Sequence, residues 1–337
     1  MNTPALEPQD QRLLNLIQSS FPLDTEPFKV MGEKLGISEA EAIQRVAGLK
    51  KKNVVRQISA IFDTRRLGYK TTLVAMRFSQ ESLTRAAHHI NRHPGVSHNY
   101  ARNSFFNLWF TIAVPPYEDL RETVERLGRE TGAEAVRIMP TLRFFKIGVN
   151  FDMVSGESAA YDYYSPDGYK DGQGKWNSVE PVTDFEVKVI REMQEDLPLM
   201  PRPFLGMAQR LGISEAQLFA HAADFQSRGI MRRFSAVLHH RRAGFRANGM
   251  AVWRVPSERS EEVGRLMASH PAVTHCYERP TFPDWPYTHF SMIHATSKER
   301  CEEIAGEISS KTGITDYQVL YSYREYKKTR VRYFAEA

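Results

Sequence analysis

The chain contains the same unit twice, and this duplication constrains its fold more than any other feature. Residues 93–102 read His-Pro-Gly-Val-Ser-His-Asn-Tyr-Ala-Arg, and residues 270–279 read His-Pro-Ala-Val-Thr-His-Cys-Tyr-Glu-Arg. Leu-Gly-Ile-Ser-Glu-Ala also occurs twice, starting at Leu35 and at Leu211. Two copies of one unit in one chain predict a covalent pseudo-dimer, in which a face of one copy pairs with the corresponding face of the other.

The composition is typical of a globular protein, and its positive net charge favours an acidic partner. The 337 residues are enough for two or three domains with their own cores. The net charge of +5 favours either a nucleic acid or a small polycarboxylate as partner. Cys276 and Cys301 form no Cys-x-x-Cys pair, which disfavours a zinc site and a disulfide framework. We find no signal peptide and no apolar run of about 20 residues, so we expect a cytoplasmic protein without a membrane span.

Each copy begins with a pattern typical of a winged helix-turn-helix. In the first copy a short helix over 28–35 ends at Gly36, and Ser38 caps a third helix with Glu41 as its capping-box partner. The second copy repeats this pattern from Ser214. The strands that flank these helices as wings are predicted at 54–62 and 231–238.

After each wing the hydrophobic period changes, and the elements follow the βαββαβ order of a ferredoxin-like domain. We expect the first set at 71–78, 81–91, 96–102, 105–114, 117–131 and 136–146. We expect the second set at 249–255, 258–269, 273–279, 287–295, 298–312 and 317–326. The predicted fold class is therefore α+β, with two tandem copies of a winged helix-turn-helix plus a ferredoxin-like domain.

The predicted domain boundaries follow from these two sets. The helix-turn-helix domains are expected at 10–64 and 183–240, and the ferredoxin-like domains at 65–153 and 241–334. The intervening 154–182 segment is rich in glycine and proline, which predicts a flexible linker. Its aromatic residues leave an ordered loop packed on the partner half as the alternative.

The repeated ten-residue motif has a composition that a packed core does not need. Two imidazoles, a phenol and a guanidinium within ten residues suit a site that binds an anion and moves a proton. A histidine on a strand can equally be a structural or a surface residue, and that alternative stays open. His93 and His270 each precede proline, where a turn role is favoured.

These motifs resemble one branch of the Lrp/AsnC family of transcription regulators, which combines a helix-turn-helix with a ferredoxin-like domain. Val-Ser-His-Asn-Tyr-x-Arg at 96–102, followed by Phe-Asn-Leu-Trp-Phe-Thr at 106–111, is similar to the first subunit of siroheme decarboxylases. Val-Thr-His-Cys-Tyr-Glu-Arg-Pro-Thr-Phe-Pro-Asp-Trp-Pro-Tyr at 273–287 is similar to the second subunit. The chain thus resembles a fusion of two subunits.

The resemblance implies removal of the carboxyl groups of two acetate side chains, at C12 and C18 of siroheme. The product would be 12,18-didecarboxysiroheme, a precursor of haem d1 or, by an alternative route, of protohaem. It also implies that no cofactor or metal is needed beyond the iron tetrapyrrole substrate. The fused form favours the haem d1 branch, although no residue excludes the other.

The two matched histidines, His98 and His275, are the predicted proton donors, because a positioned imidazole has a pKa near working pH. Arginine binds carboxylates in bidentate fashion, and aromatic rings suit a flat tetrapyrrole. The predicted substrate-binding residues are Tyr100, Arg102, Trp109, Arg143, Lys146, Tyr277, Arg279, Trp285, Tyr287, His289, Arg324 and Lys327. His289 could contact the iron or a propionate, or face water.

Two rival functions remain, a ligand-responsive DNA-binding regulator and a tetrapyrrole carrier without chemistry. A regulator places basic or amide side chains at the start of its third helix. Here that position reads Ser-Glu-Ala-Glu from Ser38 and Ser-Glu-Ala-Gln from Ser214, and carboxylates near DNA phosphates are unfavourable. The sequence therefore disfavours DNA binding. Such domains also associate through sheet edges, so a homo-oligomer is a further expectation.

Overall fold

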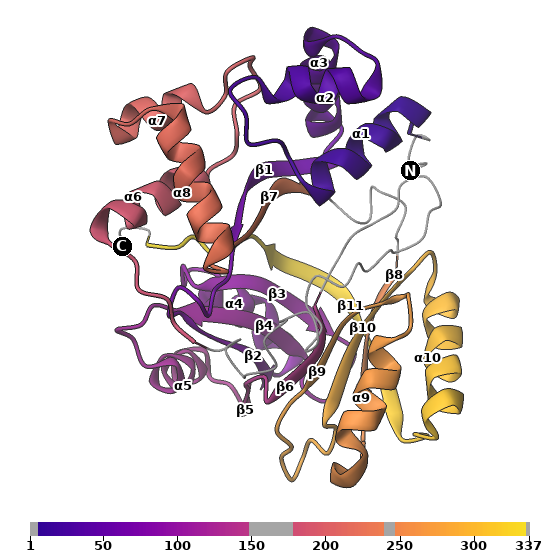
Figure 1. Cartoon of the computed structure of the whole chain (residues 1–337). Helices are drawn as coiled ribbons and strands as arrows, with labels where there is room; N and C mark the ends of the chain where they lie inside the picture. Colours follow the sequence, from indigo (N-terminus) through magenta and orange to yellow (C-terminus); the bar gives the residue numbers. More distant parts are fainter. Residues whose placement is uncertain (1–5, 148–177, 239–246, 335–337) are drawn as a thin grey trace.

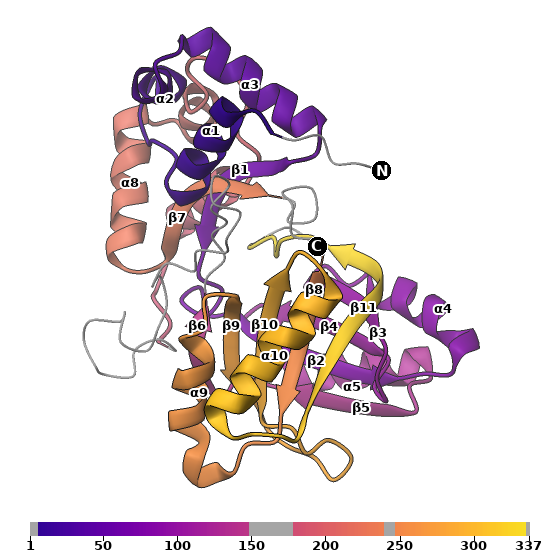
Figure 2. The ribbon, with the colours of Figure 1, turned by 90° about the vertical axis from the view of Figure 1, so that its right-hand side faces the viewer.

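The computed structural model describes residues 6–147, 178–238 and 247–334. The helix-turn-helix elements of both copies gather at one end of the molecule, and the ferredoxin-like halves form the other end (Figures 1 and 2). Most of the predicted 154–182 linker lies outside the described residues. Within the described residues, no helix has the length and apolar content that a membrane crossing requires.

The two helix-turn-helix units pair through their wings. The unit of the first copy comprises α1 (Pro8–Ser19), α2 (Pro27–Leu35), α3 (Glu39–Lys51) and the wing β1 (Val55–Phe62). The second copy comprises α6 (Asp184–Met193), α7 (Leu205–Leu211), α8 (Glu215–Ser227) and the wing β7 (Met231–Leu238). The wings β1 and β7 form a two-stranded antiparallel sheet, and one apolar core joins both units. The prediction of a pseudo-dimer is confirmed in this part.

One predicted capping box is incomplete. Ser38 Oγ accepts a hydrogen bond from the Glu41 amide at 3.1 Å, as expected for a helix N-cap. The Glu41 carboxylate, however, accepts from Arg45 Nε at 2.9 Å instead of reaching back to the Ser38 amide. In the second copy Ser214 and Gln217 form the full reciprocal box. The neighbouring cation, which the local pattern does not take into account, decides the difference.

The remaining strands form one sheet that contains both copies. The first copy contributes β2 (Lys70–Arg77), α4 (Gln80–Ile90), β3 (Val96–Arg102), β4 (Leu108–Val114), α5 (Leu120–Thr131), β5 (Ala135–Met139) and β6 (Arg143–Ile147). The second contributes β8 (Ala247–Trp253), η3 (Ser257–Arg259), α9 (Ser260–Ala268), β9 (Val273–Glu278), β10 (His289–Ala295), α10 (Lys298–Thr312) and β11 (Tyr317–Lys328). The strand order is β5-β2-β4-β3-β11-β8-β10-β9-β6. The predicted α+β class with two ferredoxin-like units is confirmed.

The last strand of the first copy differs from the prediction of one strand over 136–146. It breaks at Pro140, which has no N–H to give to a ladder. Before the break β5 pairs with β2 of its own copy, and after it β6 pairs with β9 of the other copy. Its counterpart β11 stays continuous, pairing first with β8 and then with β3 of the first copy. Each copy therefore completes the sheet of the other.

This exchange makes the sheet curl. Its two outermost strands, β5 and β6, are consecutive in the chain and are separated only by residues 140–142. Four residue steps span at most about 14 Å, so the two ends of the nine-stranded sheet must lie close together. Helices α4 and α5 cover the outside of one half, and α9 and α10 cover the other (Figure 1). The inner face of the sheet carries side chains from both copies, which line a common interior.

The exchanged strand β6 packs closely against α9. An added Cβ at Gly264 of α9 would lie 2.3 to 2.5 Å from ring carbons of Phe145 on β6. At Gly306 of α10, by contrast, no atom lies within 4 Å of an added Cβ. Strand exchange in this half therefore depends on a glycine at one helical position.

We expect Gly264→Ala to lower the free energy of unfolding by about 1–3 kcal/mol, because the buried Phe145 ring cannot move away without disturbing the core. The matched variant Gly306→Ala should instead raise it by about 0.5–1 kcal/mol, through helix propensity alone. Chemical denaturation measures both values. Equal effects of the two substitutions would contradict the close packing of β6 on α9.

Candidate active site

The two copies of the repeated motif line one cavity of about 430 Å³ inside the curled sheet. Side chains alternate between the faces of a strand, so His98, Tyr100 and Arg102 of β3 share the inner face. His275 and Tyr277 of β9, with Arg279 directly after it, are placed in the same way and line the same cavity. The structure thus brings together six of the predicted site residues, three from each copy, and Trp109 of β4 joins them.

The rest of the wall mixes polar and apolar groups. The further lining residues are Thr64, Arg65, Thr71, Thr72, Leu73, Ser97, Phe110, Thr111, Thr141, Asn248, Met250, Phe290, Met292, His294, Lys328 and Val331. A second cavity of about 470 Å³ shares Ser97, His98 and Val331 with the first and is bordered by Arg330. His98 therefore lies between two adjoining spaces. A site of this size and lining suits a small-molecule ligand with both flat apolar and charged parts.

The two motif arginines are buried cations without an acidic partner. Arg102 and Arg279 are 5% and 9% exposed. Arg102 Nη1 donates to the Leu320 carbonyl of the second copy at 3.0 Å, and Arg279 Nη1 donates reciprocally to the Met139 carbonyl of the first. Each Nε is buried with no hydrogen-bond acceptor among the described residues, and no carboxylate in those ranges pairs with either guanidinium. Burial lowers the pKa of both to about 10.

A buried guanidinium is stable when a carboxylate shares its environment, because the attraction then offsets the loss of hydration. In this cavity the chain supplies carbonyl oxygens and the aromatic faces of Tyr100 and Tyr277, whose ring centroids lie 5.5 and 5.0 Å from the guanidinium carbons. No carboxylate of the described residues supplies the opposite charge. Two such buried cations suit a ligand with at least two negative groups.

The two motif histidines are neutral in the substrate-free protein. Burial lowers the pKa of His98 to about 4, and Lys328 and Arg56 oppose its protonation further. Burial likewise lowers the pKa of His275 to about 4, with Arg232 and His98 adding to the effect. Each ring is fixed by the hydroxyl that precedes it, at 3.0 Å from Ser97 Oγ to His98 Nδ1 and 3.0 Å from Thr274 Oγ1 to His275 Nδ1. Among the described residues the second ring nitrogen, Nε2, has no hydrogen-bond partner, and both imidazoles line the cavity.

These lowered values predict a pH dependence of stability. An unfolded histidine titrates near pH 6.5, so between about pH 6.5 and about pH 4 the unfolded chain binds more protons than the folded one. The free energy of unfolding should therefore fall as pH drops through this window, by at most about 3.4 kcal/mol per histidine. We expect His98→Gln and His275→Gln each to flatten this slope in urea titrations at several pH values. An unchanged slope in both variants would show that the imidazoles are solvated.

Four further predicted cations lie outside the cavity and bind the protein itself. Lys146 Nζ donates to the His270 carbonyl at 3.1 Å, and Lys327 Nζ donates to the Asn91 and His93 carbonyls at 2.8 and 3.3 Å. Both lysines thus cross to the His-Pro turn of the other copy. Arg143 pairs with Glu261 and Glu278, and Arg324 donates to Thr84 at 3.3 Å. These four residues occupy matching positions in the two copies, but their side chains bind the other copy and do not line the cavity.

Three predicted aromatic and imidazole groups also lie away from the cavity wall. Trp285 and Tyr287 belong to an apolar cluster in the sheet interior. Trp109 belongs to the same cluster, with its ring centroid 5.2 Å from that of Trp285, and it also lines the cavity. His289 is fully buried, with Nε2 3.0 Å from the Ser260 carbonyl and its ring stacked on Phe145. Its nitrogens are occupied by the protein, so it faces neither iron nor water.

Three titratable groups of the wall, Arg65, His294 and Lys328, were not predicted from the sequence. His294 lies on the same face of its strand as Phe290 and Met292, so strand alternation could have predicted that it faces the cavity. Lys328 carried no such signal, because β11 has irregular register toward β3 between Ser322 and Arg324 and again between Glu325 and Lys327. An irregularity of this kind changes which residues face inward.

The turn role expected for the first histidine of each motif is confirmed. His93 Nδ1 accepts from the Gly95 amide at 3.1 Å, and His270 Nδ1 accepts from the Ala272 amide at 3.2 Å. Each imidazole therefore closes the turn that leads from a helix into β3 or β9. The turn fixes where β3 and β9 begin, two residues before His98 and His275.

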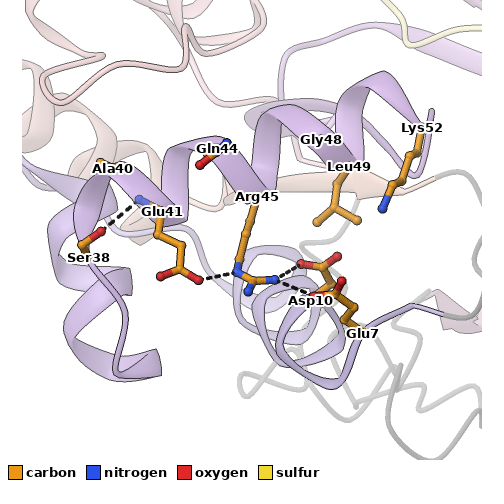
Figure 3. A pocket seen from close by; sticks show the side chains of 10 residues that line it. All are labelled: Glu7, Asp10, Ser38, Ala40, Glu41, Gln44, Arg45, Gly48, Leu49 and Lys52. Carbon is orange, nitrogen blue, oxygen red and sulfur yellow. Dashed lines mark hydrogen bonds and ion pairs between the residues drawn. The ribbon is translucent and has the colours of Figure 1, made fainter.

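The helix-turn-helix end carries a separate, shallow hollow of about 590 Å³ (Figure 3). Figure 3 shows Arg45 of α3 at its base, pairing with Glu41 at 2.9 Å, Asp10 at 3.0 Å and Glu7 at 3.1 Å. One guanidinium thus meets three carboxylates, which fix α3 against α1 and neutralise Arg45. Lys52 also lines the hollow, so the charge there is mixed, with a carboxylate in excess. The hollow has none of the motif residues of the central cavity.

The fold and cavity define a protein of the AsnC-like class with paired ligand-binding domains. The AsnC-like ligand binding domain matches residues 66–146 and 242–327, and the siroheme decarboxylase NirDL-like HTH domain matches 10–56 and 186–232. A siroheme decarboxylase of Hydrogenobacter thermophilus is 38% identical over 326 residues, covering 96% of this chain and 95% of the relative. The chain therefore belongs to the siroheme decarboxylase family, and it is a carboxy-lyase.

Two further relatives support the domain arrangement. The siroheme decarboxylase beta subunit of Methanosarcina barkeri is 48% identical over 147 residues, which are 97% of that subunit and 44% of this chain. A crystal structure of the siroheme decarboxylase NirDL in co-complex with an iron-uroporphyrin III analogue superposes with a TM-score of 0.73 at 33% identity, covering 97% of this chain and 95% of the other. The present chain joins in one polypeptide what other members keep as subunits.

Proposed function

We propose that this protein removes carbon dioxide from the acetate side chains at C12 and C18 of siroheme, giving 12,18-didecarboxysiroheme for the haem d1 branch. The observation that carries the proposal is the convergence in one cavity of two histidines and two buried arginines that no carboxylate of the described residues pairs with, one of each from either copy. Membership of the siroheme decarboxylase family supplies the substrate class.

In this proposal Arg102 and Arg279 each bind a carboxylate of the macrocycle. Their free Nε and remaining Nη groups offer the bidentate geometry that a carboxylate accepts. Trp109, Tyr100 and Tyr277 line the space between them and suit the flat ring. The side chains that lose carbon dioxide then lie toward His98 and His275.

Each decarboxylation consumes one proton. The bond between the acetate methylene and its carboxylate carbon breaks, carbon dioxide leaves, and the electron pair remains on the methylene, where the conjugated macrocycle spreads it. A proton from the nearby imidazole Nε2 then converts the methylene into a methyl group. One histidine from each copy serves one acetate.

Substrate charge adjusts the acidity of these histidines. In the free protein burial holds the pKa of both near 4, so neither is protonated at neutral pH. A ligand with many carboxylates raises the pKa of a neighbouring imidazole, because it favours the charged form. Binding of the substrate therefore brings protons into the site at the point where the reaction consumes them.

The deciding experiment adds siroheme to the protein without oxygen and follows the visible spectrum and the product mass. Loss of two carbon dioxide molecules per siroheme supports the decarboxylase. A spectral shift at constant mass would make the protein a carrier. An unchanged spectrum, together with sequence-dependent DNA binding in a competition bandshift, would favour the regulator, which the pairing of Arg45 with three carboxylates disfavours.

A further inference from the structure

The two motif histidines differ in what lies behind them. In the second copy Thr274 Oγ1 lies 3.0 Å from His275 Nδ1 and also 3.0 Å from Nδ1 of a third histidine, His294. In the first copy Ser97 Oγ lies 3.0 Å from His98 Nδ1, and the position equivalent to His294 is Ala113. The backbone establishes this equivalence, because the His294 amide donates to Ala272 as the Ala113 amide donates to Gly95.

One hydroxyl between two imidazole nitrogens links their protonation. The Thr274 hydroxyl has a single proton, so it can donate to only one Nδ1 and must accept from the other. When it donates to His275 Nδ1, the Nε2 of His275 carries a proton toward the cavity, and His294 holds its own proton on Nδ1. The Met292 carbonyl, at 3.3 Å from Oγ1, is the more distant alternative acceptor.

His294 has a polar setting that a purely structural residue of the core does not need. It lines the cavity and is 7% exposed. Asn248 lies opposite it in the β8–β10 ladder, and the Asn248 Oδ1 atom is buried without a hydrogen-bond partner among the described residues. Burial, His275 and Lys328 all lower the pKa of His294, so it is neutral and able to pass a proton on without holding charge.

We propose that His294 and Thr274 form a relay that returns a proton to His275 after each decarboxylation. His275 Nε2 gives its proton to the methylene carbon, the Thr274 hydroxyl proton moves to His275 Nδ1, and the His294 Nδ1 proton moves to Thr274 Oγ1. His294 then takes one proton from water at Nε2, which leaves His275 with its proton on Nδ1. Before the next turnover His275 Nε2 takes a proton from water, the protons on Nδ1 and Oγ1 shift back toward His294, and His294 Nε2 releases one, so one proton enters for each one consumed. In the described part of the chain Ala113 stands where a third histidine would serve His98, and the two acetates are therefore protonated at different rates.

This inference depends on the proposed function, and its test separates the two. Thr274→Val keeps the shape but loses the hydroxyl, Thr274→Ser keeps the hydroxyl as Ser97 does, and His294→Asn removes the relay end. We expect Thr274→Val and His294→Asn to slow siroheme decarboxylation in single turnover about 10-fold, to leave the steady-state KM unchanged, and to accumulate product that has lost one carbon dioxide. Their solvent deuterium isotope effect should also change, and Thr274→Ser should restore both readouts.

The ¹⁵N shifts of the histidine rings in the substrate-free protein give a readout apart from turnover. Thr274→Val should change the tautomers of His275 and His294 together and leave His98 as it is. Wild-type rates and isotope effects in both Thr274→Val and His294→Asn would overturn the relay while the decarboxylase proposal stands. Unchanged siroheme with the wild-type protein would overturn the decarboxylase proposal and the relay with it.

Discussion

Replacement of His98 or His275 by alanine should lower siroheme turnover by about 10²- to 10⁴-fold, because each imidazole supplies the proton that completes one decarboxylation. The effect should appear in the turnover rate more than in KM, since neither ring is the main anion ligand. Anaerobic assays with product mass measure the two steps separately. A variant in one copy should stop at product that has lost one carbon dioxide.

The control for this prediction is His89→Ala, because His89 is half-exposed on α4, pairs with Glu130 and does not line the cavity. It should turn over like the wild type. Thermal unfolding should show that both active-site variants remain folded, since His98 and His275 face a cavity and leave no void in the core. Wild-type turnover in both His98→Ala and His275→Ala would remove their catalytic role.

The second large effect is expected at the buried arginines and has opposite signs for binding and stability. Arg102→Met or Arg279→Met removes a buried charge that no carboxylate of the described residues offsets, so the free protein should gain about 1–3 kcal/mol in unfolding free energy. Binding of iron-uroporphyrin should lose about 2–4 kcal/mol, or about 30- to 1000-fold in affinity. Chemical denaturation and a spectroscopic titration measure the two quantities.

An exposed arginine provides the matched control. Arg121 on α5 is 77% exposed in its side chain, and Arg121→Met should leave both the affinity and the stability nearly unchanged. A variant of Arg102 or Arg279 that loses stability and keeps its affinity would assign these residues a structural role only. The account would then need another source of cations for the substrate carboxylates.

Much of the fold could be predicted from the sequence because the two copies report the same elements independently. The repeat of Ser38 at Ser214 as a helix cap and the alternation of His98, Tyr100 and Arg102 are local signals, and local geometry decides them. These signals also placed the centre of the candidate site, since strand alternation puts all three side chains on one face.

The rest depends on contacts between the copies, which no local pattern carries. The break at Pro140 and the crossing of β6 to β9 are decided by which copy supplies the partner strand. The irregular register of β11 then places Lys328 rather than Lys327 in the cavity wall. Residues that matched between copies, such as Lys146 and Lys327, therefore hold the halves together instead of lining the cavity.

A crystal structure of this protein with iron-uroporphyrin III tests the central claim most directly, namely that one cavity shared by the two copies binds the macrocycle. The account predicts carboxylates of the ligand on the guanidinium groups of Arg102 and Arg279, and acetate side chains within hydrogen-bonding reach of His98 and His275. A macrocycle bound elsewhere, with this cavity empty and neither imidazole near an acetate, would contradict it.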